Sequence, residues 1–295
     1  MTASFATVYP IAKCLWPETE KFLGHELNWE FNEARPLQRM MRILREPAMS
    51  GLESFSPGEL KAVSADNVNV INRFLRENGF RNMNLTDMGS GSNFMYLAAA
   101  MKLLGEYLQY GEKGHYLPKI SRKAFRLGKE AGVKHFQYGD KVVVEIPTKG
   151  NFSLLVTSPF EKALGWEMVL PWAIAIRSIT TSRPLDTGNG VILSMANIDE
   201  TPMDVSDLVG MTAGDWVVCQ AKMAAKFSLT PFQVKFESAF AMGAMRGGGH
   251  AKPAVQPGDY VADHDLAFAI MRKGQVLPLV AGLVPVADLA NEDLR

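Results

Sequence analysis

The sequence predicts an α+β fold in which helices pack on mainly antiparallel or mixed β-sheets. Helical periodicity dominates the first half of the chain, and strand-like runs separated by turn signals dominate the second half. A loop rich in glycine and proline then precedes a closing pair of strands. The 295 residues contain no internal repeat and no interdomain linker, so we expect one domain that spans residues 1–295.

The helical half begins with an amphipathic segment, Ala34–Pro47, whose arginines lie on the face opposite its apolar residues. We expect Pro47 to end this helix, because proline removes a backbone donor. The apolar residues at helical spacing are Leu37, Met40, Met41 and Leu44.

A second helix is predicted over Asp66–Glu77, with Asp66 as its N-cap and Gly79 as its stop signal. Its predicted buried stripe consists of Val70, Ile71, Phe74 and Leu75.

Two further segments have an ambiguous pattern. Asn93–Gly111 is rich in alanine and leucine, which by themselves favour a helix, although a run this short is also compatible with a buried strand. Lys119–His135 is a basic run, which we interpret as the solvated face of a helix in preference to a contact with an anionic partner.

The strand-rich half begins with Lys141–Pro159, where two β-rich runs flank a Thr-Lys-Gly-Asn turn and predict a hairpin. Pro147 indicates that the first strand lies at an edge or ends there. Gly190–Met211 predicts a strand, a polar bend and a short helix that starts near Pro202 or Asp204.

The last part of the chain predicts an extended run, a loop and two strands. Gln233–Met245 is extended and partly alternating, and Arg246–Asp259 is the loop rich in glycine and proline. The closing strands are expected at Val261–Ile270 and Leu277–Val284.

The composition argues against several classes of function. Lys+Arg and Asp+Glu both number 31, so we expect no global attraction to nucleic acid or to anionic membranes. No stretch reaches the roughly 18 apolar residues that span a bilayer, and the N-terminus does not resemble a signal peptide. We therefore expect a soluble, intracellular or cytoplasmic protein. Cys14 and Cys219 are too few for a disulfide framework, and two free, buried thiols are favoured over one bridge.

No segment supplies a convincing catalytic constellation. Asp87–Asn93 lacks the Lys and Ser/Thr of a phosphate-binding loop, so a turn is favoured. His264 stands between Asp263 and Asp265 without a second histidine at ligand spacing, which favours a polar strand entry over a metal or general-base site. The sequence therefore predicts no metal, no cofactor and no enzymatic activity. It favours a binding, inhibitory or structural protein.

Taken in order, these segments resemble the serpin family of serine protease inhibitors. "YVADHDLAFAIMRKGQVLPLVAGLVP" is similar to the serpin C-terminal signature, with Asp265 and Leu266 in place of its usual Pro and Phe. "FQYGDKVVVEIPTKGNFSLLVTSP" resembles the buried hairpin of the family, with Thr148 in place of an aromatic residue, and "VINRFLRENGF" resembles one of its helices. The resemblance covers residues 67–286 in the correct order, whereas roughly the first 60 residues are atypical.

The resemblance implies a buried strand within Asn93–Gly111 and an exposed, reactive-centre-like loop at Glu237–Asp259. In serpins this loop is attacked by the protease and, once cut, inserts into the sheet as a new central strand. The residues implied for the hinge of the loop are Glu237, Ser238, Ala239, Phe240 and Ala241. The implied candidate cleavage-site residues are Arg246 and Lys252.

The composition of this loop argues against insertion. Phe240, Met242 and Met245 are large for positions that must enter a packed sheet, and overpacking costs about 1–3 kcal/mol per misfit. Pro253 also makes Lys252 a poor cleavage site.

We therefore predict a serpin-fold protein that is non-inhibitory and acts through binding or structural assembly with a protein partner. Its exposed loop would be the recognition element. Two alternatives stay open. One is a suicide inhibitor of a serine or cysteine protease, and the other is an unrelated enzyme with a site around His264 or Cys219. The sequence does not fix the oligomeric state.

Overall fold

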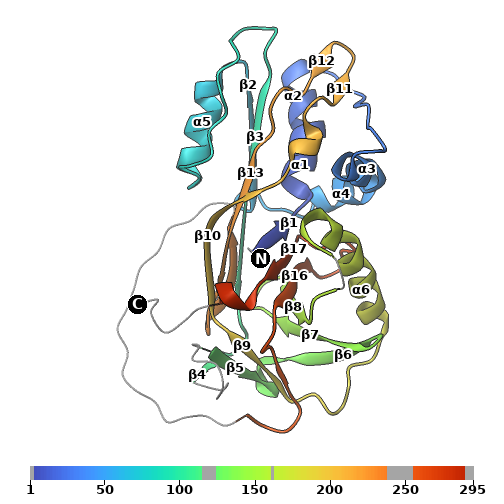
Figure 1. Ribbon diagram of the computed structural model, residues 1–295, viewed down its shortest axis with the longest axis vertical. Helices are drawn as coiled ribbons and strands as arrows, with labels where there is room; N and C mark the ends of the chain where they lie inside the picture. The colour runs from blue at the N-terminus through green and yellow to red at the C-terminus, as the bar shows by residue number, and fades with distance from the viewer. Residues whose placement is uncertain (1–2, 115–123, 161–162, 238–254, 290–295) are drawn as a thin grey trace.

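The protein has a mixed α+β fold built from three main sheets and a two-stranded ribbon (Figure 1). The computed structural model describes residues 3–114, 124–160, 163–237 and 255–289. Over these ranges, no helix is long and apolar enough to cross a membrane.

A five-stranded sheet forms the elongated part of the molecule. Helix α5 (Val68–Glu77) lies on one side of it and helix α1 (Tyr9–Lys13) on the other (Figure 1). All neighbouring strands in this sheet are antiparallel. Their order is β10 (Ala196–Met203), β13 (Met223–Leu229), β14 (Gln233–Glu237), β3 (Tyr96–Glu106) and β2 (Leu60–Ala65).

A six-stranded sheet packs against the lower half of this elongated sheet. Helix α6 (Val169–Thr181) covers its other face through a buried cluster that includes Trp172, Ile176 and Leu155. The strand order is β1 (Ser4–Ala6), β17 (Val280–Val284), β16 (Leu266–Arg272), β8 (Phe152–Thr157), β7 (Lys141–Pro147) and β6 (Lys134–Tyr138).

A four-stranded sheet lies at the lower end of the molecule in Figure 1. Its strands are β15 (Asp259–Val261), β9 (Gly190–Ser194), β5 (Ala124–Gly128) and β4 (Glu112–Gly114). The ribbon pairs β11 (Thr212–Ala213) with β12 (Trp216–Val217). Apart from 3₁₀ turns, the other helical segments of the described ranges are a π-helical turn (Cys14–Glu18), α2 (Thr19–Leu23), α3 (Pro36–Ile43) and α4 (Arg45–Leu52).

An aromatic cluster joins the two larger sheets. Phe227 of β13 stacks on Phe268 of β16 with ring centroids 4.2 Å apart, and Phe5 contacts both rings as well as Phe236 of β14. Gly282 of β17 stands opposite Phe268, and a Cβ atom there would lie 2.3 Å from the Phe268 ring. Only glycine therefore leaves room for the ring that connects the sheets.

The closing strand pair is confirmed with later starts, since β16 begins at Leu266 and not at Val261, and β17 begins at Val280 and not at Leu277. β16 pairs antiparallel with both β17 and β8, so the C-terminal pair lies directly beside the predicted hairpin. That hairpin is also confirmed as β7 and β8, and Pro147 is the last residue of β7, where a missing backbone donor is tolerated.

The first predicted helix is divided in two. α3 ends at Ile43, and α4 starts at Arg45 with Pro47 in its first turn, so the expectation that Pro47 ends the helix was wrong. Proline is compatible with a first turn because the backbone N–H groups there have no intrahelical acceptor.

The second predicted helix is confirmed with a shifted start. Asn67, and not Asp66, is its cap, because the Asn67 side chain accepts a hydrogen bond from the backbone N–H of Asn69. Ile71 and Leu75 are buried as predicted, whereas Val70 and Phe74 are only half-buried and Val68 is buried in addition.

Three other segments also differ from their local pattern. Asn93–Gly111 contains the strand β3 and not a helix, as the family resemblance implied. Lys119–His135 contains the strand β5, all five residues of which are buried, so its interpretation as a solvated helix face was wrong. The polar bend expected after β9 is the strand β10, and the helix after it is a single 3₁₀ turn at Ser206–Leu208.

Candidate functional site

The candidate site is the span between β14 and β15, residues 237–259, which we call the loop segment. Glu237 is the last residue of β14, in register with Lys226 of β13 and Lys102 of β3. The other implied hinge and cleavage-site residues lie outside the described part of the chain; they are Ser238, Ala239, Phe240, Ala241, Arg246 and Lys252.

The start of the loop segment is held by a sheet. β14 follows β13 through a tight turn, in which the backbone N–H of Thr230 donates to the carbonyl of Gln233 at 3.1 Å. β14 then runs between β13 and β3 and buries Val234 and Phe236. We call β14 the entry tether, because it fixes residue 237 in the middle of the five-stranded sheet.

The end of the loop segment is held by a buried ion pair. The Arg126 guanidinium donates from Nε and Nη2 to the two carboxylate oxygens of Asp259, at 2.8 and 3.0 Å. The two side chains are 6% and 0% exposed. The hydrogen bond to Asp259 raises the pKa of Arg126 above its ordinary value. This bidentate, desolvated pair, the exit tether, fixes the start of β15.

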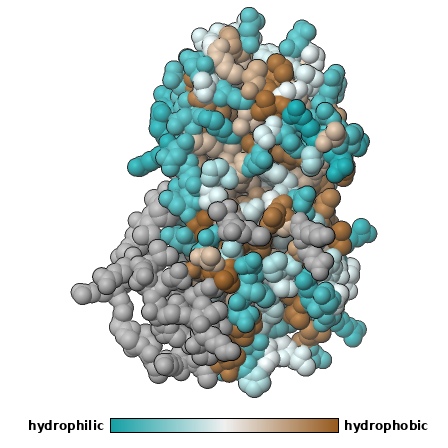
Figure 2. All heavy atoms as spheres, viewed as in Figure 1, coloured by the Kyte–Doolittle hydropathy of each residue, from teal (hydrophilic) through white to brown (hydrophobic). Residues whose placement is uncertain are grey.

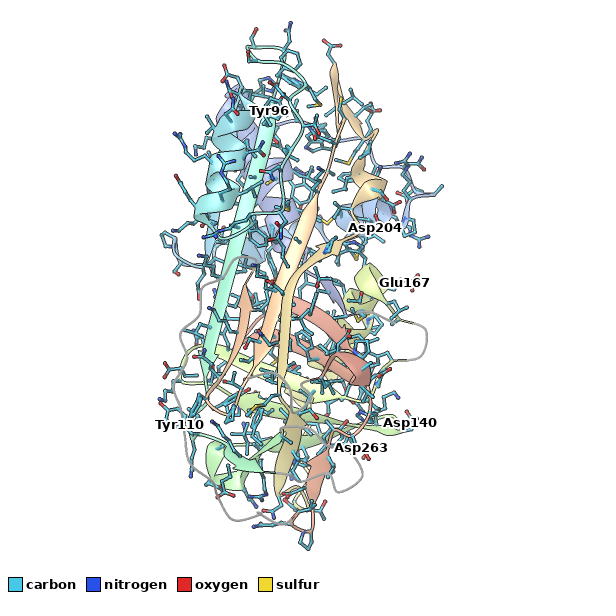
Figure 3. All side chains as sticks on the ribbon, turned by 60° about the vertical axis from the view of Figure 1, so that its left-hand side comes forward. Tyr96, Tyr110, Asp140, Glu167, Asp204 and Asp263 are labelled. Carbon is cyan, nitrogen blue, oxygen red and sulfur yellow. The ribbon has the colours of Figure 1, made fainter. Side chains whose placement is uncertain are left out.

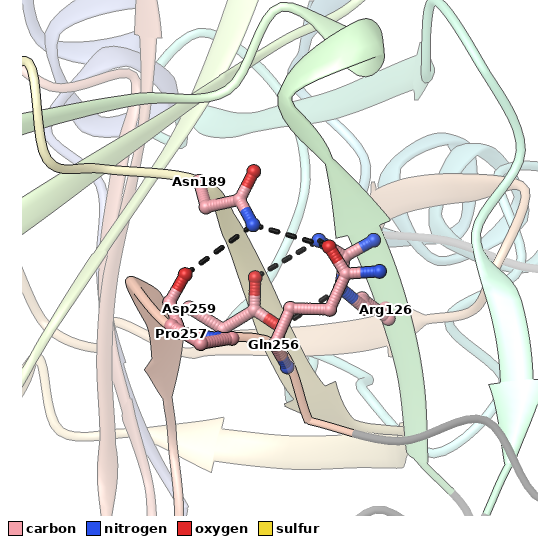
Figure 4. Close-up of polar contacts among 5 residues, drawn as sticks. All are labelled: Arg126, Asn189, Gln256, Pro257 and Asp259. Atoms are coloured by element: carbon pink, nitrogen blue, oxygen red, sulfur yellow. Dashed lines mark hydrogen bonds and ion pairs between the residues drawn. The ribbon is translucent and has the colours of Figure 1, made fainter.

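Neighbouring amides complete the exit tether (Figure 4). The Gln256 side-chain oxygen accepts from Arg126 Nη2 and from Asn189 Nδ2, both at 3.1 Å. The Gln256 backbone N–H donates to Asp259 at 2.9 Å. Gly190 is required beside this cluster, since a Cβ atom there would lie 2.6 Å from the Leu127 carbonyl and 2.8 Å from an Asp259 carboxylate oxygen.

A buried histidine lies near the exit tether. His135 of β6 is buried, and its Nε2 has no hydrogen-bond partner in the described part of the chain. Burial lowers the pKa of His135, against the opposing effects of a hydrogen bond to the Gly190 backbone and of the Asp259 carboxylate. The His135 imidazole beside the exit tether therefore stays neutral at a lower pH than an ordinary histidine.

An apolar cleft lies in line with the entry tether. β14 pairs with residues 102–106 of β3 and residues 226–229 of β13. Beyond it, among the described residues, no strand separates residues 96–100 of β3 from residues 223–225 of β13. A cavity of about 200 Å³ lies at this opening. Its lining includes Ile11, Cys14 and Leu15 from the α1 side and Leu75 and Leu85 from the α5 side.

The other residues singled out in the sequence do not meet at one site. The His264 ring nitrogen Nε2 contacts the Tyr260 hydroxyl at 3.2 Å, and the Asp265 carboxylate accepts from the Val286 backbone N–H. Both cysteines are free, but the expectation that both are buried was wrong, because Cys219 is exposed and Cys14 is half-buried. Within the described ranges, no group of three His, Cys, Asp or Glu residues is arranged to hold a metal ion.

Sequence reasoning missed the residues of the exit tether. Arg126 lay in a basic run interpreted as solvated, and Asp259 lay at the end of a loop. The one available signal was that apolar residues flank a single arginine within Ala124–Gly128, which the sequence analysis did not interpret as a buried strand. A buried arginine needs a carboxylate partner, which the sequence does not identify.

The visible surface does not favour another site over this one. In Figure 2, hydrophobic side chains are scattered among hydrophilic ones over the coloured part of the face. Isolated apolar side chains of this kind are ordinary on protein surfaces.

The arrangement of the sheets and the closing strand pair defines a serpin-like fold. No protein-family model matches the chain, and no curated protein matches it. Among solved structures, a serpin from the trematode Schistosoma haematobium is similar, with a TM-score of 0.51 and 12% identity over 87% of this chain and 83% of that chain. At that identity the likeness establishes the fold alone.

Two other solved structures were also found. Serpin48 of the insect Tenebrio molitor has 14% identity, and thyroxine-binding globulin in complex with thyroxine has 11%. Each has a TM-score of 0.49 and covers 96% of this chain and 92% of its own chain.

Proposed function

We infer that this protein is a non-inhibitory binding or assembly protein whose loop segment is recognised by a protein partner. The observation that carries this inference is the pair of tethers. The entry tether fixes residue 237 in the five-stranded sheet, and the exit tether fixes Asp259 in the four-stranded sheet. A segment presented between two rigid elements loses less conformational entropy when a partner binds it, which favours a recognition role.

Steric arguments support the non-inhibitory assignment. Insertion of a cut loop would extend β14 into the apolar cleft, where the side chains of Met83, Leu85 and Met88 already lie on the α5 side. Phe240 and Met242 are large for the interior of a sheet. Overpacking costs about 1–3 kcal/mol per misfit, and insertion must also be faster than hydrolysis of the acyl-enzyme.

Incubation with proteases tests this assignment. The protein would be mixed with a trypsin-like and with an elastase-like serine protease and then separated by denaturing electrophoresis. We expect nicking within the loop segment or no reaction, and no covalent complex. The matched controls are Arg246→Ala and Lys252→Ala, which should abolish trypsin-like nicking at the substituted site. A complex that survives denaturation would overturn the proposal.

The second candidate, a suicide inhibitor, is favoured by one observation: two strand edges face each other in line with β14. An inhibitor of this kind gains stability when the cut segment adds a strand. The melting temperature of the nicked protein therefore separates the two candidates. A sharp rise would support inhibition, whereas an unchanged or lower value supports the binding role.

The binding role itself is tested by replacing residues 240–254 with a Gly/Ser linker of equal length. Because both tethers remain, we expect the melting temperature to change little. Assembly or partner binding through the loop segment should be lost, which sedimentation velocity would detect if the partner is a second copy. Unchanged self-association in the variant would exclude the loop segment as the assembly element.

A further inference from the structure

Residues 83–89 cross the α5 side of the apolar cleft as an irregular segment, which we call the strap. The strap joins the end of the α5 region to the start of β3. Its apolar side chains Met83 and Leu85 are half-buried against the cluster formed by α5 and β3. Met83, Leu85 and Met88 all line the cleft. The strap therefore covers the opening between β3 and β13.

Two side-chain amides hold the backbone of the strap. Asn72 of α5 donates from Nδ2 to the Leu85 carbonyl at 3.0 Å and accepts from the Leu85 N–H at 2.8 Å. Gln220, just before β13, donates from Nε2 to the Thr86 carbonyl at 2.7 Å and accepts from the Thr86 N–H at 2.9 Å. The consecutive residues Leu85 and Thr86 are thus hydrogen-bonded by side chains from opposite sides of the cleft.

Further contacts fix the ends of the strap. Lys222 Nζ donates to the Asn84 carbonyl at 2.7 Å. The hydroxyl of Tyr96, which lies near the upper end of β3 in Figure 3, accepts from the Met88 N–H at 2.8 Å and donates to the Gly89 carbonyl at 2.9 Å. These contacts link the strap to β3 and to the strand across the cleft.

The geometry points to a latch: we propose that Asn72 and Gln220 hold the strap over the cleft, and that their release opens the cleft to solvent while the sheets stay folded. The strap belongs to no helix or strand, so it can leave without breaking a backbone ladder. Opening would uncover the facing parts of β3 and β13, directly in line with the entry tether. The latch controls access to the cleft and not to the loop segment, so it goes beyond the proposed function and does not rest on it.

The chain contains a reporter for this opening. Cys14 is half-buried and lines the cleft from the α1 side, and desolvation, followed by the nearby Glu18 carboxylate, raises the pKa of its thiol to about 12. A thiol in that environment reacts slowly, because the thiolate is the reactive form. Cys219 is exposed and would be replaced by Ser in every variant, so that only Cys14 is measured.

The experiment follows labelling of Cys14 by N-ethylmaleimide with mass spectrometry in native buffer. We expect Asn72→Ala and Gln220→Ala each to accelerate labelling about tenfold. Each substitution removes the two hydrogen bonds of one side-chain amide to the strap, and a loss of that size changes the equilibrium between the closed and open cleft by about this factor. Gln220→Glu, which keeps an acceptor for the Thr86 N–H but loses the donor, should give an intermediate rate. No protease and no partner is involved, so the result is independent of the test of the proposed function.

Two controls separate the latch from general destabilisation. Gln137→Ala removes an exposed amide that donates to the Gly139 carbonyl on the six-stranded sheet, and it should leave labelling unchanged. Thr157→Val removes a buried hydroxyl that donates to the Val142 carbonyl, and it should lower the free energy of unfolding without accelerating labelling in native buffer.

The proposal is overturned if neither Asn72→Ala nor Gln220→Ala accelerates labelling, or if the acceleration matches the loss in unfolding free energy. If either variant fails to fold, the urea dependence of labelling in the Cys219→Ser protein decides the question. A rate that is independent of low urea indicates local opening and supports the latch, whereas a rate that follows global unfolding excludes it.

Discussion

The two large sheets differ in how completely their strands are paired. In the six-stranded sheet, β16 lies between β8 and β17, and all seven of its residues are buried. In the five-stranded sheet, the five residues of β14 stand beside the eleven of β3, and the cleft begins where β14 ends. The strap that covers this opening is held mainly by side chains.

This difference indicates which of the two sheets can open locally. A fully paired, fully buried sheet opens only with global unfolding, whereas a region with a cavity and side-chain contacts opens at lower free energy. The loop segment starts in the incompletely filled five-stranded sheet and ends at a buried ion pair in the four-stranded sheet.

The largest expected effect is in the aromatic cluster between the two sheets. Phe268→Ala should lower the free energy of unfolding by about 4 kcal/mol, because it removes a fully buried ring and leaves a cavity beside Phe227. Urea denaturation followed by circular dichroism measures this loss. The exposed Leu104→Ala on β3 is the control and should cost less than about 1 kcal/mol. Similar losses in both variants would contradict the assignment of the cluster as the main core.

The next largest effect is expected at the exit tether. Asp259→Ala leaves the Arg126 guanidinium buried without its partner, and breaking a buried pair in this way costs about 3 kcal/mol. The double variant Arg126→Met with Asp259→Leu should recover much of that loss. Glu33→Ala, which breaks the exposed pair with Arg42, should change the unfolding free energy by less than about 1 kcal/mol. Equal effects at the buried and the exposed pair would show that the exit tether is not desolvated.

The smallest effect is a pH dependence that His135 contributes. Its pKa is lowered in the folded protein, so the unfolded chain binds more protons as the pH falls below the ordinary histidine value of 6.5. The stability is therefore complete above that pH and decreases as the pH falls toward the lowered folded value. His135→Gln should flatten the slope of unfolding free energy between about pH 7.5 and 5.5. An unchanged slope would mean that His135 is solvated in the folded state.

Local pattern was a good guide where sequence neighbours are also the structural partners. The strands of the β7–β8 hairpin are joined by a tight turn, and those of the closing pair β16–β17 by residues 273–279, so each pair forms between neighbours in the chain. The α5 helix was predicted for a similar reason, because its apolar residues repeat at helical spacing.

Local pattern failed where contacts between distant segments overrode it. β3 is rich in alanine and leucine, and its helix propensity is overridden by antiparallel pairing with β2 and β14. β5 is similar, since all its residues are buried and its one charge is neutralised by Asp259, far away in the sequence. The contacts of Asn72 and Gln220 with the strap could not be predicted either, because a single amide residue is not part of any repeating sequence pattern.

The sequence by itself determined the helices with one apolar face, the turns, the short-range strand pairs and the order of segments that resembles a serpin. Each of these depends on the periodicity or turn chemistry of residues close together in the chain. Only the tertiary structure decided which strand lies in the middle of the five-stranded sheet, which carboxylate neutralises Arg126 and what covers the cleft. Those outcomes depend on desolvation and packing between distant segments, and these energies exist only once the sheets have come together.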